Sequence, residues 1–361
     1  MEGKLSTDNG ATWSSTVTLK SGLTGSGGVT DGTAFPENGT HFVGVFYGMT
    51  AVSGGTSFGF LRHRNGDSAG VWTDESSALT FFGNERADEW VSVAKADNGR
   101  LFVLTRNSNA AASGAVKNTL YKRNPGGAWS KFKVNTSVEW SSPAVGIDDT
   151  NDRVYVMGIR TESPNYAEYK ICDFGNESEL ETQSAAVLLN NSGDAFGDLT
   201  TPDKSLYSAS GLLVCGGNLS SDDVWYRQIN FNGSSPPQAG ALTDANTTAT
   251  LAKSNQSKLF YFQSAWWLAA LDAGDQDWFL WKFQNGAWSR DLKIETRAAA
   301  RIDIVLEAAN NRLYYVSSHS SATQFGRLLY SNGAWAEEMA LVEVANFDDS
   351  GNNPVSLARA N

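Results

Sequence analysis

The stretch Ser6-Thr7-Asp8-Asn9-Gly10-Ala11-Thr12-Trp13 ends in a glycine turn followed by tryptophan, and this ending returns along the chain. Four later copies of the turn end at Trp72, Trp129, Trp288 and Trp335. The intervals between the five tryptophans are 59, 57, 159 and 47 residues. The longest interval leaves room for two degenerate copies of the turn, near Gly175-Asn176 and Asn232-Gly233. A period of about 50 residues indicates an internally repeated fold. Seven such turns predict seven repeats.

The segment before each turn repeats one order of expected strands. In one copy, residues 90–94 and 100–105 (RLFVLT) are apolar strands joined by the turn at residues 97–99. Residues 118–122 and 131–134 continue the pattern as a third and a fourth strand. Four antiparallel strands in a unit of about 50 residues are typical of a propeller blade. The sequence therefore predicts an all-β fold, a single seven-bladed β-propeller domain over residues 1–361 with four-stranded antiparallel blades.

Both ends of the chain are expected in the last blade. Residues 4–6 open directly in what the repeat marks as a third strand, and residues 354–358 resemble the first strand of a blade. We therefore expect the last blade to be closed by both chain termini, with its second strand missing or trimmed. The chain is expected to be a monomer or one domain of a larger protein.

Composition and charge narrow the classes of function. The net charge of -11 and the isoelectric point near 4.8 oppose binding to a phosphate backbone, so nucleic acid is not an expected partner. No apolar run reaches the roughly 18 residues of a spanning helix, so membrane insertion is not expected. Charged residues make up only 19% while Ser, Thr and Asn are abundant, a composition frequent on extracellular and cell-surface proteins. Cys172 and Cys215 form no zinc-site spacing, and no metal site is expected.

The first turn has the pattern of an Asp-box. Residues 6–13 match S-x-D-x-G-x-T-W at each defined position, which resembles the repeat of sialidases and related Asp-box (BNR-repeat) propellers. In such a hairpin Asp8 can cap backbone N–H groups, Gly10 can take the positive φ, and Trp13 can pack between sheets. The resemblance implies a structural role for these residues, because the box lies between the third and fourth strands, opposite the usual binding face.

The resemblance also implies chemistry on carbohydrates. The Arg-Ile-Pro motif of sialidases has no counterpart, and the nearest string is Arg301-Ile302-Asp303. Seven-bladed relatives include glycan-binding propellers and polysaccharide lyases, and those lyases use His with Tyr and Arg. His319 and Tyr47 are therefore candidates for catalysis, with a hydrogen-bonded structural role as the alternative for His319.

Candidate site residues follow from the repeat, since the axial face of a propeller is built where first strands begin and second strands end. The second strands end at Tyr47, Arg106, Arg160, Asp272 and His319, and the first strands begin near Asp88, Trp90, Glu139, Trp140 and Arg301. Arg106 and Arg160 hold equivalent places in adjacent blades, where two guanidinium groups can clamp one carboxylate or sulfate.

The neighbouring aromatic and acidic residues extend this candidate site. Trp90 and Trp140 offer flat faces for sugar rings, and Asp272 and Arg301 are further candidate ligand contacts. Glu139 and Asp88 are candidate carboxyl groups for acid/base work. The alternative interpretation is that the charged residues form ion pairs around the channel and that both tryptophans pack between blades.

The sequence thus predicts an extracellular or surface propeller that recognises an acidic carbohydrate at its axial face. The alternatives are a glycan-active enzyme, either a glycoside hydrolase of the sialidase type or a polysaccharide lyase, and a protein-interaction scaffold. The acidic turns at residues 148–152 and 348–351 are weaker candidates for Ca²⁺, with solvated turns as the alternative. No other cofactor is expected.

Overall fold

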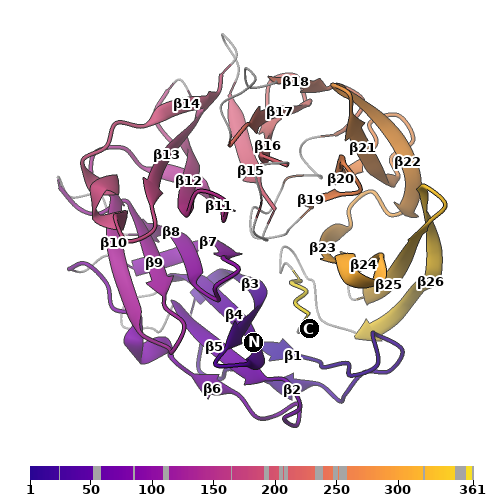
Figure 1. Ribbon diagram of the computed structural model, residues 1–361, viewed down its shortest axis with the longest axis horizontal. Coiled ribbons are helices and arrows are strands. Elements are labelled where there is room, and N and C mark those ends of the chain that lie inside the picture. The colour runs from indigo at the N-terminus through magenta and orange to yellow at the C-terminus, as the bar shows by residue number, and fades with distance from the viewer. Residues whose placement is uncertain are drawn as a thin grey trace.

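The computed structural model describes residues 1–23, 25–51, 58–83, 86–108, 114–163, 165–190, 195–202, 206, 210–231, 239–246, 251, 258–319, 322–345 and 355–359. For residues 25–28, 49–51, 86–89, 108 and 345 it describes the backbone alone. Within these residues, six four-stranded antiparallel sheets follow one another around a central axis as the blades of a β-propeller (Figure 1). In each blade the strands run from the axis to the rim in chain order.

The blades have the following strands. Blade 1 contains β3 (Gly25–Glu37), β4 (Thr40–Ala51), β5 (Phe58–Arg64) and β6 (Thr73–Asp74). Blade 2 contains β7 (Arg86–Lys95), β8 (Leu101–Ser108), β9 (Asn118–Arg123) and β10 (Trp129–Asn135), and blade 3 contains β11 (Trp140–Asp148), β12 (Arg153–Arg160), β13 (Ala167–Asp173) and β14 (Ala186–Leu189). Blade 4 contains β15 (Phe196–Thr200), β16 (Leu212–Asn218), β17 (Val224–Ile229) and β18 (Ala239–Leu242), and blade 5 contains β19 (Leu259–Phe262), β20 (Ala265–Leu271), β21 (Trp278–Gln284) and β22 (Ala287–Glu295). Blade 6 contains β23 (Arg301–Glu307), β24 (Arg312–His319), β25 (Ala322–Ser331) and β26 (Ala334–Ala345), and the short 3₁₀ helices are η1 (Ser76–Ala78), η2 (Glu177–Glu181) and η3 (Ala308–Asn310).

The prediction of seven blades is wrong, because the described residues form six complete blades. Between blade 6 and blade 1 lies a sector, here called the junction sector, that holds the pair β1 (Glu2–Gly3) and β2 (Val17–Thr18) and the terminal segment 355–359. The turn at residues 6–13, which the spacing counts as one blade, joins only β1 and β2. Both ends of the described chain therefore meet in one sector, as the repeat predicts.

The tryptophan that follows the turn packs against the preceding blade at four of the five turns, those of Trp13, Trp129, Trp288 and Trp335. Trp129 of blade 2 meets Phe46 and Phe60 of blade 1 in edge contacts, with ring centroids 5.7 and 5.3 Å apart. In the same way, Trp13 of the junction sector lies 5.1 Å from the ring of Phe325 in blade 6. The tryptophan after the repeated turn thus packs one blade against the preceding blade.

Polar side chains on the inner strands tie successive blades together at the axis. Each bond runs from one inner strand to its neighbour: Val93 N donates to Asp31 Oδ2 (2.7 Å), Val145 N to Ser92 Oγ (3.2 Å), Ser142 Oγ to Asp198 Oδ1 (2.5 Å) and Leu357 N to Asp303 Oδ2 (2.6 Å). Buried polar groups need hydrogen-bond partners, and these groups find them across the blades.

The two cysteines are free and buried, Cys172 in blade 3 and Cys215 in blade 4. Burial, with a smaller contribution from Glu177, raises the pKa of Cys172 to about 12, from roughly 8.5 in an unfolded chain. The stability that this protonated thiol contributes is complete below about pH 8.5 and is lost as the pH rises toward the folded value. Cys172→Ala should therefore make the fall of the unfolding free energy above about pH 9 shallower by about 1 kcal/mol per pH unit. Urea unfolding of both proteins at several pH values measures this, and parallel pH profiles would contradict it.

Candidate functional site

The inner strands of blades 1 to 4 share an irregularity near their start, on the face where the second strands end. The register of β3 shifts between Ser26 and Val29, and those of β7, β11 and β15 shift at equivalent places. The shifts in blades 2 to 4 include Trp90, Ser142 and Asp198, and Ser142 has a positive φ of 45°. Bulges of this kind redirect side chains and are common beside functional sites. The axial face of these blades is therefore shaped differently from that of a regular sheet.

Arg106 is the first charged group on this face. It lies near the end of β8, and its Nε is 3.6 Å from Glu139 Oε1, which stands at the start of blade 3. Its guanidinium lies 5.8 Å from the ring of Trp90 on β7. The side chains of Arg106 and Glu139 are 26% and 33% exposed, so a ligand in solvent can reach both.

Arg160 ends β12 in the next blade and lies among more partners. Its Nη1 donates to the hydroxyl of Tyr166 at 2.8 Å and its Nη2 donates to Glu162 Oε2 at 3.0 Å. Glu168 Oε1 lies 3.6 Å from Nη1. The bond to Tyr166 and the nearby carboxylates hold the pKa of Arg160 above its usual value. Its Nε is buried and has no hydrogen-bond partner among the described residues.

Glu139 connects the two arginines. Its side chain faces Arg106, while its backbone carbonyl accepts a bond of 3.1 Å from the N–H of Thr161, the residue after Arg160. The next residue, Trp140, pairs directly with Arg160 in the sheet. The structure thus brings Arg106 and Arg160 to the start of one strand, β11, which lies between them.

Trp140 does not offer a face to a sugar ring. Its side chain is fully buried, and its indole N–H donates to Glu168 Oε2 at 3.0 Å. The aromatic ring next to Arg160 is instead that of the partly buried Tyr166, whose centroid lies 5.2 Å from the guanidinium. Sequence reasoning missed Tyr166 and Glu168, because both belong to the turn into a third strand and its beginning, where the repeat predicts no axial contact.

The remaining candidates are placed in different ways. Tyr47 is buried inside blade 1, with its hydroxyl 3.1 Å from Ser76 Oγ, so it does not line the axial face. Asp272 is buried in a turn, where it accepts the N–H groups of Gly274 and Asp275. Its other oxygen forms an ion pair with Arg290 at 3.2 Å. The Asp272 carboxylate therefore stabilises the turn.

His319 is half-buried at the end of β24, and Arg301 is half-buried at the start of β23. Asp88 lies in β7, but its side chain is outside the described part of the chain. In the turn at residues 148–152, the Asp148 carboxylate accepts the N–H groups of Thr150 and Asn151, so it caps that turn. Residues 348–351 also lie outside the described part. The described residues contain no cluster of three or more potential metal ligands.

A buried charge cluster continues the axial face toward blades 4 to 6. Lys258 is 1% exposed, directly before β19, and burial lowers the pKa of its ammonium group. The negative charges of Asp303 and Asp198 oppose this shift, while the positive charge of Arg301 adds to it. These four residues come from three blades, so their charges meet at the axis. Only a lone lysine before an apolar run marks this position in the sequence, and no motif identifies it.

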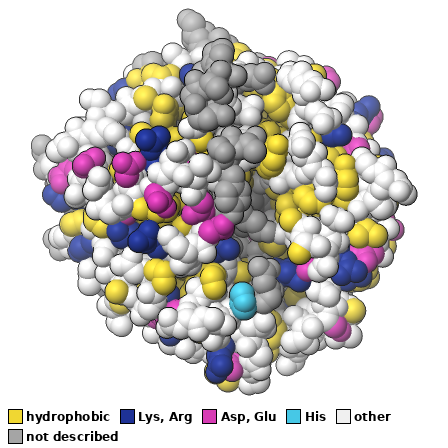
Figure 2. All heavy atoms as spheres, in the orientation of Figure 1, with side chains coloured by type: hydrophobic (Ala, Val, Ile, Leu, Met, Phe, Trp, Pro, Cys, Tyr) yellow, Lys and Arg dark blue, Asp and Glu magenta, His cyan; other side chains and the backbone are white. Residues whose placement is uncertain are grey.

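The wider surface agrees with a polar, charged face. Figure 2 shows one face of the ring, on which acidic and basic side chains lie beside one another over blades 2 and 3. No helix in the described part of the chain is long and apolar enough to span a bilayer.

Similarity to known proteins is found among solved structures. No family model matches the chain, and no curated protein matches it. Among solved structures, a protein from Lactobacillus plantarum is similar with a TM-score of 0.48 and 12% identity, over 88% of this chain and 83% of that one. The polysaccharide lyase Uly1 has a TM-score of 0.45 and 9% identity over 88% and 77% of the two chains. A neuraminidase-like protein of a little yellow-shouldered bat isolate has a TM-score of 0.44 and 10% identity over 79% and 90%. The chain is a β-propeller, and its similarity to these proteins concerns the fold alone.

Proposed function

We propose that the axial face of blades 2 and 3 binds an acidic carbohydrate, and that the protein is a glycan-recognition propeller of the Asp-box type acting outside the cell or at its surface. One observation carries the proposal. Two partly exposed arginines lie on either side of the start of β11, and each has an aromatic ring beside it, Trp90 for Arg106 and Tyr166 for Arg160.

The chemistry of these groups fits an anionic sugar. A guanidinium group binds a carboxylate or sulfate through two parallel N–H bonds, and an aromatic ring stacks on the apolar face of a sugar. The contact of 3.6 Å between Arg106 and Glu139 is longer than a hydrogen bond of ordinary length. A ligand anion can therefore replace Glu139 at this guanidinium without breaking a short bond between Arg106 and Glu139.

The ligand class is tested first with an array of sulfated, uronic and sialylated glycans and their neutral counterparts, examined for binding and for cleavage. Retention of acidic glycans only, with binding that weakens as salt rises, is the expected result. Equal binding of neutral glycans would contradict the proposal. Cleavage of a bound glycan would show that the same face is catalytic.

Arg106→Ala should weaken the best acidic glycan by about 2 kcal/mol, the scale of a charge-assisted contact. Because its ion pair is partly exposed, the unfolding free energy should change by less than about 1 kcal/mol. Titration calorimetry and a melting curve measure the two quantities. Arg153→Ala is the matched control, since Arg153 belongs to an exposed ion pair with Asp173 at the other end of β12. Unchanged affinity together with lowered stability would show that Arg106 is structural.

A further inference from the structure

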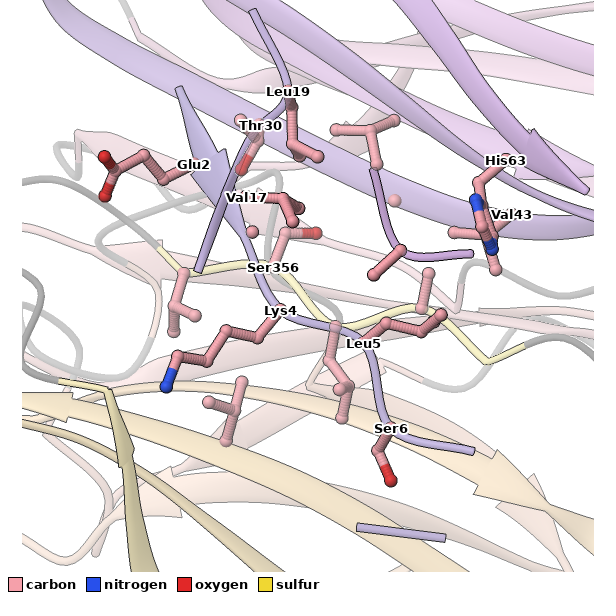
Figure 3. A pocket seen from close by; sticks show the side chains of 18 of the residues that line it. Glu2, Lys4, Leu5, Ser6, Val17, Leu19, Thr30, Val43, His63 and Ser356 are labelled. Carbon is pink, nitrogen blue, oxygen red and sulfur yellow. The ribbon is translucent and has the colours of Figure 1, made fainter. Parts of the chain in front are cut away.

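A cavity of about 1080 Å³ occupies the junction sector, away from the Arg106 and Arg160 face. It is lined by the N-terminal residues, by β3 to β5 of blade 1, by β24 and β25 of blade 6 and by the terminal segment 355–359. Figure 3 shows side chains from three of these parts around one space: Val43 and His63 of blade 1, Lys4 and Leu5 of the N-terminal segment, and Ser356 of the terminal segment.

The cavity lies where a complete blade has its second strand. The terminal segment takes the innermost place, since Leu357 N bonds to Asp303 on the inner strand of blade 6 and a Cβ on Gly32 of β3 would lie 3.1 Å from Ala358. The pair β1 and β2 takes the outer places, and Lys4 Nζ donates to the carbonyl of Val344 at the end of β26. In the described residues the sheet of β1 contains only β2. Among the described residues, the inner and outer strands of a blade are thus present without a strand between them.

The burial of β4 indicates a missing neighbour on one face. In blades 2 to 6 the second strand is buried along its apolar length, for example at residues 101–105 and 154–159. In β4 the alternate residues Val43 and Val45 remain half-buried, and both line the cavity. Side chains that alternate along a strand share one face of the sheet. The face of blade 1 toward the junction sector therefore lacks the packing that the other second strands have.

Three buried polar atoms in the cavity wall have no hydrogen-bond partner among the described residues: His63 Nε2, Ser318 Oγ and Ser356 Oγ. The imidazole of His63 bonds through Nδ1 to the carbonyl of Val71 at 2.9 Å. A carbonyl only accepts, so Nδ1 carries the proton and Nε2 of the neutral ring is an acceptor. The cavity thus contains an acceptor that an N–H group would satisfy and two hydroxyls, and buried groups of this kind normally have partners.

One edge of β1 pairs with no other strand in the described part of the chain. Met1 O accepts the N–H of Leu19, and Leu5 O accepts the N–H of Ser14. In an antiparallel pair, successive residues direct their N–H and C=O groups to opposite edges. Glu2 in β1 and Lys4 just beyond it therefore direct theirs away from β2, and both residues line the cavity.

We propose that the junction sector binds an extended segment of a partner protein, which adds to β1 as the second strand that the described residues do not supply. Second strands in blades 2 to 6 have 7 or 8 residues, which sets the length of the segment. Its side chains alternate, with apolar ones against Val43 and Val45 and small or apolar ones against Ser318 and Phe325. Addition of a strand to an exposed edge is an established mode of peptide recognition, in which the ladder supplies affinity and the alternate pockets supply specificity.

The probe for this site is a fluorescent peptide with the sequence of β12, Arg153–Arg160 (RVYVMGIR), which is itself a second strand. Anisotropy titration of the full chain should give saturable binding, half-complete below about 1 mM. A scrambled peptide and a peptide N-methylated at alternate amides should each bind at least tenfold more weakly, because register and ladder bonds are lost. No saturable binding, or equal binding of the scrambled or methylated peptide, would overturn the proposal.

A pair of variants locates the peptide. Val45→Asp places a carboxylate on the cavity wall and should weaken binding at least tenfold, because a strand packed there would leave that charge without a partner. Val187→Asp changes an exposed valine (44%) on β14 of blade 3, which does not line the cavity, and should leave binding unchanged. Equal binding by both variants would overturn the proposal. The methylated peptide tests the same proposal on the unmodified protein, so the test does not depend on the folding of a variant. The glycan array concerns a different face, so each proposal can fail alone.

Discussion

Arg123→Ala is expected to lower the free energy of unfolding by about 3–5 kcal/mol, the cost of removing one partner from a buried ion pair. Arg123 ends β9 in blade 2 with no exposed surface, and it binds two carboxylates at the boundary with blade 1. Its Nη2 lies 2.9 Å from Glu37 Oε2, and its Nε lies 2.9 Å from Glu75 Oε2. The substitution leaves two carboxylates at this site with one neighbouring guanidinium, that of Arg62, which lies 3.0 Å from Glu37 and 2.7 Å from Glu75.

The state of Glu75 supports this expectation. Burial alone would raise the pKa of Glu75, but hydrogen bonds from Arg123 and Trp129 outweigh it and hold this pKa below its usual value. The stability from this lowered pKa is present above the unfolded value, about 4.3, and is lost as the pH falls through the folded one. Arg123→Ala should therefore also flatten the loss of stability in acid.

Guanidinium unfolding measures the effect of Arg123→Ala, with Arg153→Ala as the control. Arg153 and Asp173 form an ion pair whose side chains are 41% and 60% exposed, and such pairs contribute about 0–1 kcal/mol. Similar losses for the two variants would show that the pairing between blades 1 and 2 is not the source of the effect.

Trp335→Ala is expected to cost about 3–5 kcal/mol, as for other large aromatic residues removed from a core. Trp335 follows the last turn of the repeat and is 4% exposed. Its ring meets Phe262 of blade 5 at 5.5 Å and Tyr330 of its own blade at 5.1 Å, and Phe260 and Trp267 lie about as close. The cavity left by alanine would therefore separate two blades.

Leu219→Ala is the control for Trp335→Ala, because Leu219 is 60% exposed and its removal should change the unfolding free energy by less than about 0.5 kcal/mol. Chemical denaturation compares the two variants. A loss below about 1 kcal/mol for Trp335→Ala would mean that the turn tryptophan does not dock the blades.

The strand order of a blade was predictable from sequence because it depends on local signals, namely glycine turns and apolar runs. The turn before Trp129 and the one before Trp335 each join a third strand to a fourth, as the repeat predicts. The number of complete blades was not predictable in this way. The turn at residues 6–13 matches its motif at more positions than the other turns do, yet the strands that it joins form a two-stranded sheet. The sequence of a turn specifies how two strands are joined, and not how many further strands complete the blade.

The candidate site was predictable to the level of strand ends but not of side-chain burial. Arg106 and Arg160 lie where the repeat places them, because strand ends follow from alternation along the chain. Trp140 is buried in a hydrophobic cluster, and its N–H is satisfied there by Glu168 of a different strand. This contact joins residues that are distant in the sequence. Tyr166 lies beside Arg160 for a similar reason, through the turn into β13.

The junction sector also has a consequence for the order of folding. Within a blade, hydrogen-bonded strands are close in sequence, whereas the bond from Lys4 to Val344 spans 340 residues and that from Arg327 to Asn9 spans 318. Contacts of large sequence separation form slowly, because the chain must lose loop entropy before they contribute. During synthesis, blades 1 to 6 can form one after another as they leave the ribosome, while the N-terminal hairpin must wait for blade 6 and residues 355–359. We therefore expect closure of the ring to be the last step of folding.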